Sequence, residues 1–201
     1  MTEVIILPWG RTDWADQGRL IGATNLPLNE HGRIEVTSWA SMLASSPPDK
    51  LQYGPEEAGR ETTSILARRL HIRHGRPSKQ LREPSLGLWE GLTVVELEQR
   101  FTSAYEDWRG SPESFCPPEG EPVADAAERL HAAAERVLRK DADERVLFVV
   151  GPMAAALLRC KLAGEPISEF WTYLHAEAPM WRLKWPPAGA GGGPVEPARS
   201  A

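Results

Sequence analysis

The chain has 201 residues, which is enough for one domain of ordinary size with a single sizeable core. Its 41% hydrophobic and 25% charged residues are typical of a water-soluble globular protein, and no apolar stretch approaches the roughly 20 residues that span a bilayer. The formal net charge of −5 argues against nucleic acid or an anionic membrane as a partner. The two cysteines, Cys116 and Cys160, lie far apart and no secretory segment opens the sequence, so we expect reduced thiols and a cytoplasmic protein.

The first half of the chain alternates short apolar runs with amphipathic segments. The run from Val4 to Leu7, bounded by proline and glycine, predicts a buried strand. Apolar residues at helical spacing predict a helix from Glu35 to Leu43. A second short strand is expected from Leu51 to Tyr53, followed by a helix from about Glu56 to Arg69.

Signals for a helix start and for a long loop follow. Thr93 and Glu96 have the spacing of a capping box, which predicts that a helix begins near Val94. The stretch from Ser111 to Pro122 is rich in proline, glutamate and glycine and is predicted to be a loop. It is long enough that we expect the segment of about 101–122 to act as a lid.

The last third of the chain returns to the alternating pattern. A helix is predicted from Ala124 to Lys140, and buried strands from Arg145 to Val150 and from Met180 to Trp185. Strands that alternate with helices indicate an α/β fold, here a three-layer α/β/α sandwich with a mainly parallel central sheet. We expect residues 1–185 to form this domain and the proline- and glycine-rich residues 186–201 to form a disordered tail.

Several segments, in order and with the expected spacing, resemble the histidine phosphatase (phosphoglycerate mutase-like) superfamily. The resemblance covers about residues 3–185 and implies the phosphoglycerate mutase-like fold. The matching segments are Ile5–Trp14, Gly18–Gly22, Leu26–Gly32, Arg60–Thr63, Leu81–Thr93, Pro117–Asp125 and the strand Val146–Gly151.

The resemblance also implies which residues should carry the chemistry. The family uses a histidine nucleophile, a second histidine, two arginines and a carboxylic acid, which suits the spread of negative charge during phosphoryl transfer. In this sequence the first arginine falls on Pro8, the nucleophile on Trp9, the second arginine on Ala58 and the second histidine on Pro152. Only the acid is kept, as Glu83. An indole has no basic nitrogen that could attack phosphorus.

These replacements lead to the hypothesis of a catalytically inactive pseudophosphatase. Such a chain would act as a protein-binding or regulatory module, with a protein partner or a second copy of itself. We expect Trp9 to fill the volume that phosphate would occupy. No metal and no cofactor are expected.

Two alternatives stay open from the residues. In the first, a rebuilt site around Glu83, Glu121 and Arg11 binds or transforms another small molecule. In the second, residual phosphatase or mutase activity acts on a phosphorylated metabolite. An alignment that places Arg60 in the pocket requires a two-residue slip, which rotates the side chain by about half a helical turn.

Individual charged residues also admit more than one interpretation. Glu83 is either a remnant acid with an unusual pKa or a solvated carboxylate at a strand end, and the second interpretation is favoured. Arg11 is expected to pair with Glu83 or Glu121. His71 and His74 are interpreted as a surface pair, and the turn that contains Arg73, Arg76 and Lys79 as a solvated loop.

Overall fold

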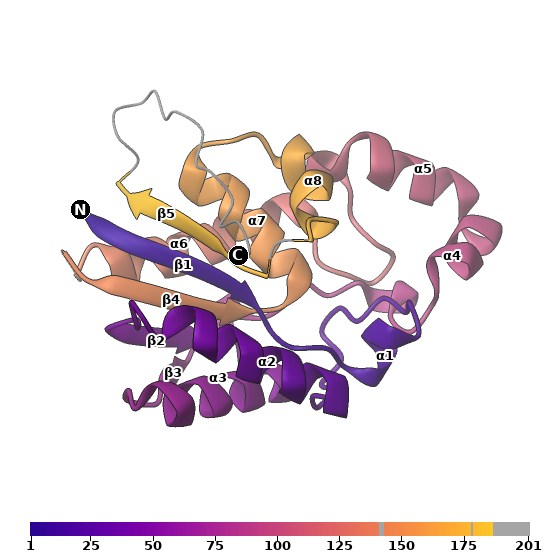
Figure 1. Ribbon diagram of the computed structural model, residues 1–201. Coiled ribbons are helices and arrows are strands. Elements are labelled where there is room, and N and C mark those ends of the chain that lie inside the picture. Colours follow the sequence, from indigo (N-terminus) through magenta and orange to yellow (C-terminus); the bar gives the residue numbers. More distant parts are fainter. Residues whose placement is uncertain (141–142, 178, 187–201) are drawn as a thin grey trace.

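The computed structural model describes residues 1–140, 143–177 and 179–186. A five-stranded sheet in the order β3-β2-β4-β1-β5 lies between two layers of helices (Figure 1). Strands β1, β2, β3 and β4 run parallel, and β5 pairs antiparallel with β1. The expected three-layer, mainly parallel sandwich is therefore confirmed. The strands are β1 (Thr2–Pro8), β2 (Lys50–Tyr53), β3 (Arg76–Pro77), β4 (Arg145–Val150) and β5 (Trp181–Trp185).

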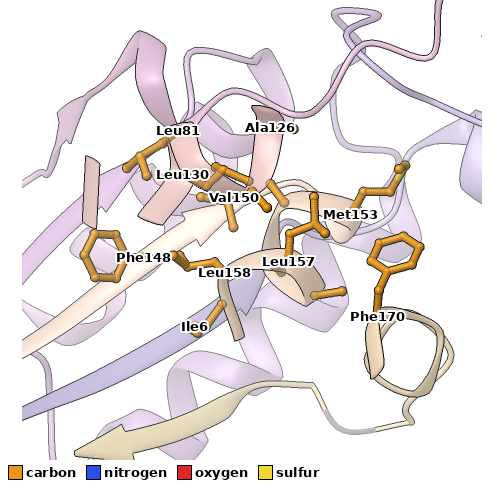
Figure 2. Close-up of a cluster of buried hydrophobic side chains, with 14 of the residues drawn as sticks. Ile6, Leu81, Ala126, Leu130, Phe148, Val150, Met153, Leu157, Leu158 and Phe170 are labelled. Carbon is orange, nitrogen blue, oxygen red and sulfur yellow. The ribbon is translucent and has the colours of Figure 1, made fainter. Parts of the chain in front are cut away.

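Each face of the sheet has its own hydrophobic core because successive side chains of a strand point to opposite faces. Ile6 and Phe148 belong to one core with residues of α6 (Val123–Leu138), α7 (Pro152–Ala163) and α8 (Phe170–Leu174), part of which Figure 2 shows. On the opposite face, the second core includes Ile5 and Leu7 of β1. This second core is completed by residues of α2 (Glu30–Leu43) and α3 (Glu57–Leu70).

The predicted helices are present, with boundaries set by capping groups that the apolar pattern does not reveal. Helix α2 begins at Glu30, earlier than the expected Glu35, because the Asn29 side chain accepts a hydrogen bond from the Gly32 amide at 2.8 Å. The capping box is confirmed at the start of α4 (Val94–Arg100). There the Glu96 amide donates to Thr93 Oγ1, and the Thr93 amide donates to the Glu96 carboxylate.

The segment expected to be a lid is more ordered than a loop. Residues Thr102–Gly110 form α5, and a 3₁₀ turn follows at Pro112–Ser114. Aromatic rings fasten the segment to the domain: Trp108 lies edge-on to Trp171 at 4.7 Å between ring centroids, and Phe115 stacks on Trp89 at 4.9 Å. The remaining short elements are α1 (Asp13–Asp16) and the 3₁₀ turns Lys79–Leu81, Gly87–Trp89 and Ile167–Glu169.

Glu90, within the segment Gly87 to Thr93, joins two loops. Its carboxylate accepts hydrogen bonds from the amides of Ala23 and Leu86 and from the hydroxyl of Thr24. Gly22 adopts a φ of +57° next to this carboxylate, and a Cβ there would lie 2.4 Å from Glu90 Oε1. This part of the family resemblance therefore reflects loop architecture.

Two expectations concern features outside the core. Of the predicted tail, residues 187–201 lie outside the described residues. Within the part of the chain that the structure describes, no helix is long and apolar enough to cross a membrane.

Replacing Leu130 with alanine tests the core formed by α6 and α7. Leu130 is fully buried, so Leu130→Ala is expected to lower the free energy of unfolding by about 2–5 kcal/mol. Leu88→Ala, at a side chain that is 54% exposed, is the matched control and should change stability by less than about 0.5 kcal/mol. Urea denaturation measures both values, and equal losses in the two variants would show that this layer is not a packed core.

Candidate functional site

The candidate site lies where the parallel strands β1, β2 and β4 reach their carboxyl ends. The chain leaving β1 is tied to β4 by a 2.9 Å bond from the Trp9 amide to the Val150 carbonyl. The chain leaving β2 is tied to the same strand by a bond from the Gly54 amide to the Val149 carbonyl. Ligands of open α/β sheets bind at this edge, so the segments that follow these strands are the place to look for functional groups.

Glu83 is the central side chain of this region. It is only 1% exposed, and its carboxyl group lies at the N-terminus of α7. Oε1 accepts a hydrogen bond from the Met153 amide and Oε2 accepts one from the Ala154 amide, both at 2.8 Å. Neither Gly151 nor Pro152 can cap this helix with its own side chain, so Glu83 supplies the cap from a distant segment.

The position of Glu83 contradicts its interpretation as a solvated carboxylate. The segment that carries it comes from the turn after β3 and folds inward beneath α7, rather than ending in solvent. Close packing leaves no room for a side chain at Gly151, where a Cβ would lie 2.2 Å from Glu83 Oε2 and 2.7 Å from the Trp9 ring. The remnant-acid interpretation is the one that this burial supports.

A second buried carboxyl group, that of Glu56, lies beside Glu83. Glu56 is 6% exposed, and its Oε1 accepts a 2.8 Å hydrogen bond from the backbone amide of Glu83. Its Oε2 has no hydrogen-bond partner among the described residues. Glu56 precedes α3 directly, and sequence reasoning missed it because it was assigned to that helix and not to the edge of the sheet.

Burial shifts the pKa of both acids upward. It raises the pKa of Glu83 to about 8, against the opposing effect of the two amide bonds, and the nearby Glu56 adds to the rise. Burial also raises the pKa of Glu56. Glu83 therefore carries a proton near neutral pH. A neutral carboxylic acid can still accept both amide bonds while it keeps one O–H to donate.

Trp9 fills the space beside these carboxyl groups. The side chain is 5% exposed and belongs to the same core as Ala58, which is 1% exposed. Its ring passes close to Gly59 of α3 and to Gly151, and its Nε1 has no hydrogen-bond partner within the described ranges. Pro8 and Pro152 are half-buried at the ends of β1 and the start of α7. Trp9 and Glu83 are therefore both buried in this structure.

The structure does not bring two predicted ligand-binding arginines to Glu83. Arg11 is exposed and pairs with Glu35 at 2.9 Å and with Asp16 at 3.3 Å, so its expected partners Glu83 and Glu121 are wrong. The reason is that α2 and α1 approach the chain closely just after β1. Arg60 lies on the exposed side of α3 and pairs with Glu57, because it is two residues away from the buried Ala58 along the helix.

Glu121 acts through two arginines that the sequence analysis did not identify. Its carboxylate accepts bonds from Arg82 at 2.8 Å and from Arg129 at 2.7 and 2.8 Å. Arg129 also donates to the carbonyls of Gln80 and Arg82, which fixes the backbone immediately before Glu83. Arg82 is partly exposed and is the cation nearest to Glu83 in sequence. The family resemblance implies a role only for the acid in this segment, so a role for the neighbouring Arg82 was not predicted.

Comparisons with known proteins agree with this α/β architecture and place the chain in a family. The family model described as histidine phosphatase superfamily (branch 1) matches residues 5–190, so the chain belongs to this superfamily. It is similar to phosphoserine phosphatase 1 of Hydrogenobacter thermophilus, with 21% identity over 86% of this chain and 82% of the relative. It is also similar to glucosyl-3-phosphoglycerate phosphatase of Mycobacterium tuberculosis, with 25% identity over 90% of this chain and 92% of the relative.

A solved structure gives the same fold. The mycobacterial glucosyl-3-phosphoglycerate phosphatase complexed with VO3 superposes with a TM-score of 0.76 and 24% identity, covering 84% of this chain and 85% of that chain.

These relatives correct the hypothesis of a catalytically inactive, protein-binding module, and with it the expectation that the chain is not an enzyme. The relatives over most of its length carry the names of phosphatases. The hypothesis rested on the residues at four positions of one mechanism. It took no account of the buried carboxyl groups at the same edge of the sheet, which only the folded chain brings together.

The raised pKa of Glu83 predicts a pH dependence of stability. Because the folded pKa lies above the usual value of 4.5, the folded state favours the protonated acid, and this stabilisation is lost as the pH rises through about 8. The free energy of unfolding of the native chain should therefore fall by a few kcal/mol more than that of Glu83→Gln between pH 5 and pH 9.

Denaturant titrations at each pH measure this difference. Glu106→Gln, at an exposed position of α5, is the control and should follow the native chain. Parallel curves for the native chain and Glu83→Gln would contradict a raised pKa.

Proposed function

We propose that this chain is a phosphatase that hydrolyses a phosphate monoester of a small metabolite, with Glu83 as the proton donor to the leaving oxygen. The observation that carries this proposal is a buried acid with a pKa of about 8 at the carboxyl edge of the sheet. Membership of the superfamily and the names of the relatives support the class of reaction. The cytoplasmic location stays a prediction.

Two backbone amides and one arginine near Glu83 support the binding of a phosphoryl group. Backbone amides at a helix N-terminus bind anions well, and those of Met153 and Ala154 are occupied by the Glu83 carboxyl group in this structure. In the proposed mechanism the side chain of Glu83 rotates away from these amides, and the phosphoryl oxygens take its place. The partly exposed Arg82 supplies positive charge for the oxygens that gain negative charge.

Water is the phosphoryl acceptor in this mechanism, because Trp9 offers no basic nitrogen. The water oxygen forms a bond to phosphorus as the ester P–O bond breaks, and the leaving oxygen takes the proton of Glu83. The proton lost by water goes to Glu56, whose Oε2 is unpaired in the described part of the chain. Return of this proton to Glu83 restores the starting state.

Phosphate release is the direct test of hydrolysis. The native chain should release phosphate from at least one member of a panel of O-phosphoserine, glucosyl-3-phosphoglycerate and p-nitrophenyl phosphate. Loss of a positioned acid costs about 10²–10⁴ in rate, so Glu83→Gln should lower kcat/KM by that factor, whereas Glu106→Gln purified in parallel should not change it. No release above buffer by the native chain, or equal release by Glu83→Gln, would contradict the proposal.

The pH profile of the reaction tests the role of Glu83 separately from the identity of the substrate. Because the protonated form of Glu83 is the active one, kcat/KM should fall tenfold per pH unit above about pH 8. Initial rates between pH 6 and pH 10 with the best substrate of the panel measure this limb. A rate that keeps rising through pH 9 would show that Glu83 is not the proton donor.

A further inference from the structure

The segment 68–79 carries the most concentrated positive charge of the chain. It contains five cationic side chains and no acidic one, in a protein whose formal net charge is −5. All five are exposed, at the end of α3, in the turn that follows and around β3. We name this set the basic turn: Arg68, Arg69, Arg73, Arg76 and Lys79.

None of the five forms an ion pair within the described ranges, which sets them apart from most arginines of the chain. Ten other arginines pair with described carboxylates: Arg11, Arg19, Arg33, Arg60, Arg82, Arg129, Arg139, Arg145, Arg159 and Arg182. A surface that only needs to be soluble intersperses both signs of charge. The exposure of all five side chains agrees with the solvated turn interpreted from the sequence, and without an ion pair among the described residues their charge is available to a ligand.

The backbone holds the basic turn in a defined shape. Helix α3 ends at His71 in the left-handed region with a φ of 55°, and the Ile72 amide bonds to the Ala67 carbonyl at 3.1 Å. His74 contacts Ser64 Oγ at 2.9 Å, and its ring lies edge-on to Tyr53. Binding a ligand at this surface therefore costs little conformational entropy, because the backbone of the turn is already ordered.

We propose that the basic turn is a docking site for a short acidic segment of a protein partner, a segment rich in aspartate and glutamate. Guanidinium groups bind carboxylates through paired N–H donors, so four arginines and one lysine suit a run of carboxylates. A long nucleic acid fits less well than a short acidic peptide, because it would extend over the rest of the chain, which carries a formal charge of −10 once these five cations are set aside. The segment also has no phenylalanine, tyrosine or tryptophan on which a base could stack, and the His74 ring already contacts Ser64 and Tyr53.

The α3 end of the basic turn, with Arg68 and Arg69, lies apart from the candidate site, whereas Lys79 begins the 3₁₀ turn that leads to Glu83. Helix α3 begins beside Glu56 and ends at Leu70, so its last turn lies about 20 Å away along the helix axis. Docking at this end of the basic turn can bring the protein to a partner without covering Glu83.

The experiment is a fluorescence anisotropy titration of the full chain with a labelled hexaglutamate peptide. We expect saturable binding at 50 mM salt that weakens at 300 mM salt, because exposed charge pairs are screened. Arg73→Glu combined with Arg76→Glu should weaken binding at least about tenfold. The control is Arg100→Glu combined with Arg136→Glu, which makes the same change in net charge at two exposed arginines elsewhere and should bind as the native chain does.

Three results would overturn the proposal. The first is that the peptide does not bind, or that both double variants lose the same affinity. Equal losses would mean that the peptide responds only to net charge. The second is equal or tighter binding of a labelled single-stranded oligonucleotide or of anionic vesicles under the same conditions. The third is a dimer in sedimentation experiments that dissociates in the Arg73→Glu, Arg76→Glu variant, which would make a second copy the occupant.

Discussion

The carboxyl group of Glu83 connects three parts of the chain that lie far apart in the sequence. It accepts the first two unpaired amides of α7, and its own backbone amide is held by Glu56 at the start of α3. Helix α7 is the central helix of the larger core, with most of its residues buried, yet it begins with a glycine and a proline that cannot cap it. The start of this helix, and the packing of Trp9 against it, depend on an acid supplied from another segment.

The same contact explains why the candidate site is acidic and closed. In an oxyanion site, the helix amides would face a ligand, whereas here they face a carboxyl group of the protein itself. The burial that this requires outweighs the two hydrogen bonds that favour the charged form, so the acid keeps its proton near neutral pH. An arrangement that stabilises the helix thus also creates the proton donor that the proposed reaction uses, and substrate binding must compete with it.

Away from Glu83, the charged side chains form two contrasting groups, one in which they are paired and one in which they are not. Around Glu121, two arginines and one carboxylate form a partly buried cluster that fixes the backbone before Glu83. In the basic turn, by contrast, which runs from the end of α3 to the residues around β3, five cations form no ion pair within the described part of the chain. The Glu121 cluster holds the backbone next to the candidate site, whereas the cations of the basic turn are available to a binding partner.

The sequence by itself predicted four of the five strands, the three-layer fold and the superfamily, but not β3, α1 or α8. These features follow from local periodicity, from capping residues a few positions apart and from motifs read in order, and they hold in the structure, as the capping box of Thr93 and Glu96 shows. Helix α5 and the early start of α2 escaped because their signals are weak in local composition. Only the tertiary structure decided that Glu83 is buried, that Glu56 lies beside it and that Arg11 and Arg60 face solvent. The burial of Glu83 beside Glu56 depends on groups that are 27 and 70 residues away along the chain, and a local pattern carries no information on which distant backbone will approach a given side chain.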